Sequence, residues 1–183
     1  MIFFSLYAVL ILVLCYGFAR LEDLTEQKPT IVNSISIIIA ARNEERLNDL
    51  FSNLSQLEYR SYEIIVVDDH SDVPIQESHG IKLLRPELPG KKAAITTGIQ
   101  NATGDIIVTT DADCRVNPLW LQEINKAFQK PGVKMVVGGV RIEEDMTFFS
   151  KLQALEFVSV AATGAATLGL GFPTMCNGAN LSY

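Results

Sequence analysis

The sequence has little to suggest disulfide chemistry or nucleic-acid binding. Its three cysteines, Cys15, Cys114 and Cys176, lie far apart and form no CxxC pair, so they are interpreted as isolated, reduced thiols. Lys and Arg number 15 against 21 Asp and Glu, a formal net charge of −6. No basic stripe is present to neutralise phosphates, which argues against a nucleic-acid partner. An anionic substrate must therefore be held by a metal ion or by a few lysines and arginines.

Charge is absent from residues 1–19 (MIFFSLYAVLILVLCYGFA). As a helix this stretch would span about 28 Å, close to the thickness of the hydrocarbon layer. It has neither the leading Lys or Arg nor the A-x-A-like site of a signal peptide. We therefore expect a transmembrane anchor over residues 1–20 and a polar linker over 21–34. Arg20 and Lys28 weakly favour a cytoplasmic location for the remainder of the chain, on the inner face of the cell membrane.

After the linker, apolar runs alternate with amphipathic stretches. Short runs rich in β-branched residues are typical of strands buried on both faces, and the stretches between them have helical periodicity. The predicted strands are 35–40, 63–67, 81–84, 105–110 and 133–140, and the predicted helices are 43–57, 92–101 and 117–129. This alternation predicts an α/β fold with a doubly wound, mostly parallel sheet, whose ligands bind outside the carboxyl ends of the strands.

Acidic residues follow the fourth predicted strand in the motif DAD. Asp111 and Asp113 are two residues apart, so they can point the same way as they leave the strand. Such carboxylates suit Mg²⁺ or Mn²⁺, especially an ion that bridges a diphosphate. The alternative is a loop of turn-forming aspartates, because a single DxD occurs often by chance.

Other polar residues follow the first two predicted strands and precede a helix. Asp68 and Asp69 could accept hydrogen bonds from a base or ribose, or could serve as a turn or helix cap. His70 has no histidine at ligand spacing and is interpreted as a loop residue. In the segment 42–44, Asn43 is a candidate helix N-cap, whereas Arg42 could reach a base or phosphate. The GKK motif at 90–92 precedes a helix and could bind an anion or carry solvated charge.

Five motifs occur together in one order: IIIAARNEE, VVDDHS, GKKAAI, TTDADC and NGAN. In order and approximate spacing, over residues 35–183, they resemble family 2 glycosyltransferases of the GT-A fold, the superfamily of cellulose and hyaluronan synthases. The resemblance implies a membrane-bound, inverting glycosyltransferase. Such an enzyme transfers sugar from a nucleotide-diphosphate sugar, UDP by family habit, to a glycan or lipid-linked acceptor with the help of Mn²⁺ or Mg²⁺.

The resemblance also assigns residues. Asp111 and Asp113 would bind the metal, with Asp113 the more direct ligand. The nucleotide sugar would be bound by these two aspartates together with Ala40, Arg42, Glu44, Asp68, Asp69, Lys92, Ala112, Asn177 and Gly178. The family often has Pro where Ala40 stands, which would alter only the stiffness of the loop.

The family's general base lies in an acidic motif downstream of NG, beyond Tyr183, so the catalytic base is unknown. We therefore expect residues 35–183 to be the donor-binding half of the domain, able to bind donor but not to transfer sugar. The apolar stretch 157–172 is interpreted as a helix beneath the acceptor site, in preference to a second membrane span.

Three alternatives stay open. A phospho-receiver domain would explain VVDDHS, but it would begin with that strand. A dinucleotide-dependent oxidoreductase would need GxGxxG after the first strand, where AARNEE has no glycine. The third alternative is a membrane-anchored binding module without catalysis.

Overall fold

The computed structural model describes residues 2–21, 30–76, 79–143 and 147–183. Most of the predicted linker 21–34 therefore lies outside the described residues. The chain divides into two compact units, each described by itself. One combines Met1–Asp23 with Gly139–Asn177 and is called the helical unit. The other combines Leu24–Gly138 with Gly178–Tyr183 and is called the sheet unit.

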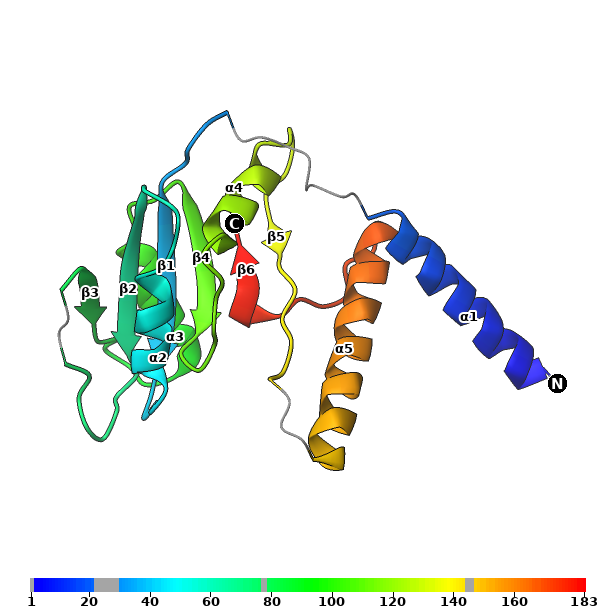
Figure 1. The fold of residues 1–183 in the computed structure, drawn as a ribbon, viewed down its shortest axis with the longest axis horizontal. Helices are drawn as coiled ribbons and strands as arrows, with labels where there is room; N and C mark the ends of the chain where they lie inside the picture. The colour runs from blue at the N-terminus through cyan, green and yellow to red at the C-terminus, as the bar shows by residue number, and fades with distance from the viewer. Residues whose placement is uncertain (1, 22–29, 77–78, 144–146) are drawn as a thin grey trace. The chain divides into compact units, whose positions relative to one another are not determined.

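The sheet unit contains one six-stranded sheet in the order β3-β2-β1-β4-β6-β5 (Figure 1). Four strands run parallel, as predicted: β1 (Ile35–Ala41), β2 (Tyr62–Asp68), β3 (Ile81–Leu84) and β4 (Ile106–Asp111). The short strand β6 (Leu181–Ser182) is antiparallel to β4 and to β5 (Val136–Val137). The sheet is therefore mixed but mostly parallel.

Helices cover both faces of this sheet. On one face, α2 (Leu47–Leu54) and α4 (Trp120–Phe128) contribute to the larger core cluster, which also includes Ile37 and Ile39 of β1. On the other face lies α3 (Lys91–Gln100), where a Cβ added to Gly98 would crowd the Ile38 side chain. Successive β1 residues point to opposite faces, so an unbroken isoleucine run feeds both layers.

The sheet unit differs most from the predicted elements in three places. The helix expected from residue 43 begins at Leu47, and Asn43 has a positive φ of 52°, so Asn43 is a loop residue and not the helix N-cap. The strand expected over 133–140 has only two residues, Val136–Val137. The strand β6 was not predicted. It follows a 3-10 turn, η1 (Gly178–Asn180), and is too short to carry a period-two pattern.

The helical unit contains α1 (Ile2–Ala19) and α5 (Phe148–Gly169). Within the described residues, α5 is the helix long and apolar enough to cross a membrane, judged by length and composition alone. The apolar stretch of α1, Phe3–Ala19, is shorter. By this length criterion the candidate span among the described residues is α5, the helix that the sequence analysis interpreted as packing beneath an acceptor site, and not the N-terminal helix.

Candidate nucleotide-sugar site

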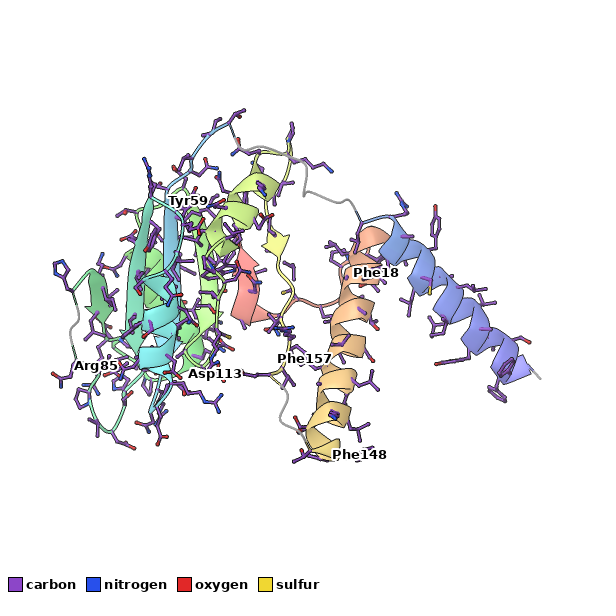
Figure 2. The ribbon with its side chains drawn as sticks, in the orientation of Figure 1. Phe18, Tyr59, Arg85, Asp113, Phe148 and Phe157 are labelled. Atoms are coloured by element: carbon purple, nitrogen blue, oxygen red, sulfur yellow. The ribbon has the colours of Figure 1, made fainter. Side chains whose placement is uncertain are left out.

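The candidate site lies at the carboxyl ends of β1, β2 and β4. In the sheet register Ala40 is paired with Asp111 across β1 and β4, and Ala41 is paired with Asp68 across β1 and β2. The chain moves outward from β1 to β2 and β3, then returns to place β4 on the other side of β1. This change of direction is a topological switch point, where α/β sheets form ligand crevices. Figure 2 labels Asp113 at this edge.

A cleft of about 230 Å³ opens at this edge. Its lining comes from the ends of β1 and β4 with the loops that follow them, from the residue after β2 and from the start of α3: Ala40, Ala41, Arg42, Glu44, Asp69, Lys91, Asp111, Ala112 and Asp113. Seven of the residues assigned from the sequence lie in this lining, although they come from separate segments of the chain. Asp68, Lys92 and Gly178 do not line the cleft, and Asn177 belongs to the helical unit.

Hydrogen bonds between the loop after β1 and the loop after β2 stabilise one edge of the cleft. The Asn43 side chain donates to Asp72 Oδ2 at 2.9 Å, and the Asp72 backbone N–H donates back to Asn43 Oδ1 at 2.8 Å. The Asn43 backbone N–H also donates to Ser71 Oγ at 3.0 Å. Asn tolerates a positive φ better than most residues. Asn43 therefore stabilises the loop that carries Arg42 and Glu44. Its partners Ser71 and Asp72 are distant in the sequence, so the local pattern could not predict these hydrogen bonds.

Asp68, the last residue of β2, and Asp69, which follows it, have different surroundings. Asp69 is buried at the cleft wall, and its Oδ1 accepts a 2.6 Å hydrogen bond from the Gly90 N–H. Gly90 precedes α3 with a φ of 125°, a conformation that favours glycine. Asp69 therefore joins the end of β2 to the start of α3.

Asp68 is buried beside the cleft, and its Oδ1 accepts the Ser71 N–H at 2.8 Å. Burial alone would raise the pKa of Asp68, but hydrogen bonds from Ser71 and from the Ile75 backbone outweigh it and hold the pKa below its ordinary value. Asp68 thus has the partners of a loop-stabilising carboxylate. His70 lies in the same loop, as predicted, with Nε2 3.1 Å from the Pro86 carbonyl oxygen.

Lys91 is a cleft residue that the sequence-based assignment missed. Its Nζ forms a 2.6 Å ion pair with Asp111 Oδ1, and the two side chains are 61% and 35% exposed. The neighbouring Lys92, which the family resemblance selected, is exposed and does not line the cleft. Two adjacent lysines at a helix start point in different directions. Only the position of α3 against the sheet decides which one faces Asp111.

The acidic pair fits a cation shared with a phosphate ligand, and does not form a complete protein cage. Asp111 ends β4, Ala112 is buried, and Asp113 is exposed where it lines the cleft. Among the described residues, no group of three or more His, Cys, Asp or Glu side chains could hold a metal ion. Mg²⁺ characteristically uses one or two carboxylates and completes its shell with water and substrate phosphates. Two carboxylates facing an open cleft meet that requirement.

The NGAN motif is tied to β4, the strand that carries Asp111. Thr109 Oγ1 donates to the Gly178 carbonyl oxygen at 2.7 Å, and Trp120 Nε1 donates to Asn180 Oδ1 at 3.0 Å. The Gly138 N–H donates to the Asn180 carbonyl oxygen at 2.8 Å. The turn at Gly178 is thus fixed against the sheet unit by hydrogen bonds to separate segments of the chain.

This arrangement defines an α/β protein with an acidic, lysine-containing cleft at the switch point of its sheet. Residues 36–178 match the family model described as Glycosyl transferase family 2. The match covers most of the chain, so the chain belongs to glycosyl transferase family 2. The resemblance seen in the motifs is confirmed, and the receiver and oxidoreductase alternatives are set aside.

The curated relatives include poly-beta-1,6-N-acetyl-D-glucosamine synthases. The chain is 29% identical over 141 residues to that of Staphylococcus epidermidis, covering 70% of this chain and 34% of the relative. It is 28% identical over 175 residues to that of Staphylococcus aureus, covering 87% of this chain and 42% of the relative. The chain therefore spans about two-fifths or less of the length of these relatives.

Solved structures confirm the GT-A fold. The mannosyltransferase PcManGT from Pyrobaculum calidifontis, in complex with GDP-Man and Mn²⁺, superposes with a TM-score of 0.64 at 19% identity, covering 98% of this chain and 54% of that chain. TarS 1-349 from S. aureus superposes with a TM-score of 0.52 at 18% identity, covering 62% of this chain and 39% of that chain. At these identities the likeness concerns the fold alone.

Proposed function

We propose that this chain binds the nucleotide-diphosphate sugar donor of a membrane-bound, inverting glycosyltransferase that uses a UDP-sugar. The single observation that carries the proposal is the cleft in which Arg42, Asp69, Lys91 and the DAD carboxylates converge at the sheet's switch point. A volume of about 230 Å³ suits part of such a donor, since pockets for drug-sized ligands span roughly 300–1,000 Å³. The acceptor is proposed to be a glycan or a lipid-linked glycan.

The residues take distinct proposed roles. Asp69 and Arg42 contact the nucleoside, with Ala40 and Glu44 lining its pocket. Asp113, assisted by Asp111, would hold Mn²⁺ or Mg²⁺. When bound, that cation would supply Lewis-acid stabilisation of the charge that develops on the departing nucleotide diphosphate. Lys91 takes the place beside the diphosphate that the family resemblance gave to Lys92.

The loop anchors support this site. Asp68 is proposed to act through Ser71, and to keep the loop after β2 in position for the nucleotide. Gly178 and Asn177 are proposed to lie beside the donor sugar. No residue within 1–183 is assigned as the base that deprotonates the acceptor.

The helix α1 is proposed to be a membrane anchor over residues 1–20, with the sheet unit on the cytoplasmic side. The charge-free composition of α1 supports this, as does the occurrence of Arg20 directly after the helix. The membrane is the inner cell membrane in this proposal.

A thermal-shift measurement tests the donor assignment. UDP at a hundredfold excess over its Kd should stabilise the protein in Mn²⁺ by about 2.7 kcal/mol. GDP and dTDP serve as parallel arms that identify the base. Folded protein whose melting temperature is unaffected by any of the three nucleotides with Mn²⁺ would contradict the assignment.

A further inference from the structure

A lysine is paired with one of the two carboxylates that the proposed cation would use. Lys91 Nζ lies 2.6 Å from Asp111 Oδ1, and both residues line the cleft. Mg²⁺ binds carboxylate oxygens at about 2.0–2.1 Å. An ammonium group in contact with Oδ1 and a divalent cation on the same carboxylate would lie close enough to repel each other. Lys91 and the cation are therefore competitors for Asp111.

From this contact we infer that Lys91 couples the cation site to the nucleotide. Its ammonium group stays on Asp111 until the donor binds, and then moves to the diphosphate. The movement makes Asp111 Oδ1 available as a cation ligand. This inference rests on the proposed donor site, and adds to it the residue that makes cation binding depend on nucleotide binding.

The backbone at Lys91 is held in place, so the exchange needs only a movement of the side chain. The preceding Gly90 donates its N–H to Asp69 Oδ1 at 2.6 Å, and its carbonyl oxygen accepts the Ala94 N–H at 3.0 Å. Both bonds fix the first turn of α3. The Lys91 side chain is 61% exposed and has a flexible four-carbon stem. Its ammonium group can therefore change partner while α3 stays where it is.

The start of α3 favours an anion beside Lys91. Lys91 and Lys92 open the helix, and its first turn contains no acidic residue. Cations are disfavoured at this end of a helix because the helix dipole is positive there. Asp111 of β4 supplies a compensating negative charge through a largely exposed ion pair. A diphosphate would supply more negative charge and would also suit the backbone N–H groups of the first turn.

The charges that line the cleft favour joint binding of cation and nucleotide. Two basic side chains face four carboxylates there: Arg42 and Lys91 against Glu44, Asp69, Asp111 and Asp113. A diphosphate alone would add negative charge to an acidic cleft, and a divalent cation alone would have to displace Lys91. Bound together they neutralise each other, and Lys91 keeps an anionic partner. Each ligand should then tighten the binding of the other by the same factor.

Lys92 provides the matched comparison. It carries the same charge in the same turn of α3, but it is exposed and does not line the cleft. An effect that arises only from positive charge near the start of α3 would appear on substitution of either lysine. An effect of the contact with Asp111 would appear at Lys91 alone.

Mn²⁺ binding by the full chain in detergent, measured without nucleotide by electron paramagnetic resonance of free Mn²⁺, tests the competition. Lys91→Met should bind Mn²⁺ about threefold more tightly than wild type, a change on the scale of an exposed ion pair, because the competing ammonium group is gone. Lys92→Met should match wild type. Equal Mn²⁺ affinity in wild type and Lys91→Met, or the same gain in Lys92→Met, would overturn the inference.

The same titration with UDP measures the coupling, after subtraction of the Mn²⁺ that UDP binds in free solution. UDP should tighten Mn²⁺ binding by the wild type, and this enhancement should be at least threefold smaller in Lys91→Met. Uridine, which has no phosphate, should leave the Mn²⁺ affinity of the wild type unchanged. An enhancement of the same size in both proteins, or one produced by uridine, would contradict the exchange.

The outcomes separate this inference from the donor site on which it rests. Absence of UDP-dependent Mn²⁺ binding in wild type would refute the donor site and the exchange together. Coupling in wild type that persists unchanged in Lys91→Met would refute the exchange alone. Tighter Mn²⁺ binding without nucleotide, together with weaker UDP binding in Mn²⁺, would support the exchange, because damage to the fold of Lys91→Met would weaken both.

Discussion

The sheet unit and the helical unit are ordered by different forces. In the sheet unit Ile37, Ile39 and Leu50 are fully buried, and polar side chains at the cleft are positioned by hydrogen bonds between distant loops. In the helical unit large side chains such as Phe3 (88%) and Phe148 (83%) remain exposed. The sheet unit supplies its own apolar interior. The helical unit leaves large apolar side chains exposed, and such surfaces mark sites that contact a protein partner or a membrane.

The largest expected effect is the difference in unfolding free energy between a core substitution in the sheet unit and an exposed substitution in the helical unit. Ile39→Ala should lower the free energy of unfolding by about 2–5 kcal/mol, because it leaves a cavity in the sheet core. Leu155→Ala, which truncates an exposed side chain of α5, should change it by less than about 0.5 kcal/mol. Urea unfolding in detergent, followed by fluorescence of the single, buried Trp120, measures both. Equal losses in the two variants would contradict this division.

A smaller effect is expected at the loop anchor Asp68. Asp68→Asn removes the carboxylate that accepts the Ser71 N–H, and should cost about 1–3 kcal/mol of unfolding free energy at neutral pH. The folded-state pKa is depressed, so this stabilisation is present above the unfolded value near 3.8 and is lost as pH falls through the folded-state pKa. The difference between wild type and variant should shrink accordingly in acid.

Unfolding curves collected between neutral pH and the lowest pH at which the protein stays folded check the sign of this pH dependence. The surface carboxylate Asp49, 61% exposed, provides the control through Asp49→Asn, which should show no comparable change. A gap between wild type and Asp68→Asn that widens as the pH falls would exclude the proposed origin of the stabilisation.

The smallest expected effect distinguishes the two lysines at the start of α3. Lys91→Met should weaken UDP binding in Mn²⁺ by about tenfold, the loss of one charge-assisted hydrogen bond to a phosphate. The stability of the free protein should change by less than about 1 kcal/mol, because the Lys91–Asp111 pair is largely exposed. Lys92→Met is the matched control and should bind UDP normally. Both affinities are measured by titration calorimetry. Weaker UDP binding by Lys92→Met, with normal binding by Lys91→Met, would assign the phosphate contact to Lys92.

Strong local patterns predicted much of the sheet unit. The isoleucine and valine runs of β1, β2 and β4 identified buried parallel strands, and the polar residues that follow them were correctly expected to lie at one edge. The two-residue strand β6 could not be predicted, because it exists only through pairing with β4 and β5, which are distant in the sequence. A segment of two residues is too short to show the alternation of apolar and polar residues that identifies a strand.

The sequence predicted the loops of the cleft and seven of its lining residues, but it did not show which of two neighbouring residues faces the cleft. Asp68 and Asp69 are neighbours in the sequence, yet one is bound to its own loop while the other lines the cleft and holds Gly90. Which of the two residues faces the cleft depends on where the strand ends, and the sequence pattern does not define that boundary.

The helical unit shows the reverse limitation. Composition identified both apolar segments, but not the close approach of α1 and α5 at Gly17 and Gly169, because this contact joins residues that are far apart in the sequence.

The most direct test of the donor site is a titration of UDP-dependent Mn²⁺ binding, with free Mn²⁺ followed by electron paramagnetic resonance. Wild-type protein with UDP should take up one Mn²⁺ per chain. Asp113→Asn should bind Mn²⁺ at least tenfold more weakly with its fold intact, and Asp49→Asn should match the wild type. Equal Mn²⁺ uptake by Asp113→Asn and wild type would contradict the assignment of the DAD carboxylates as the cation site.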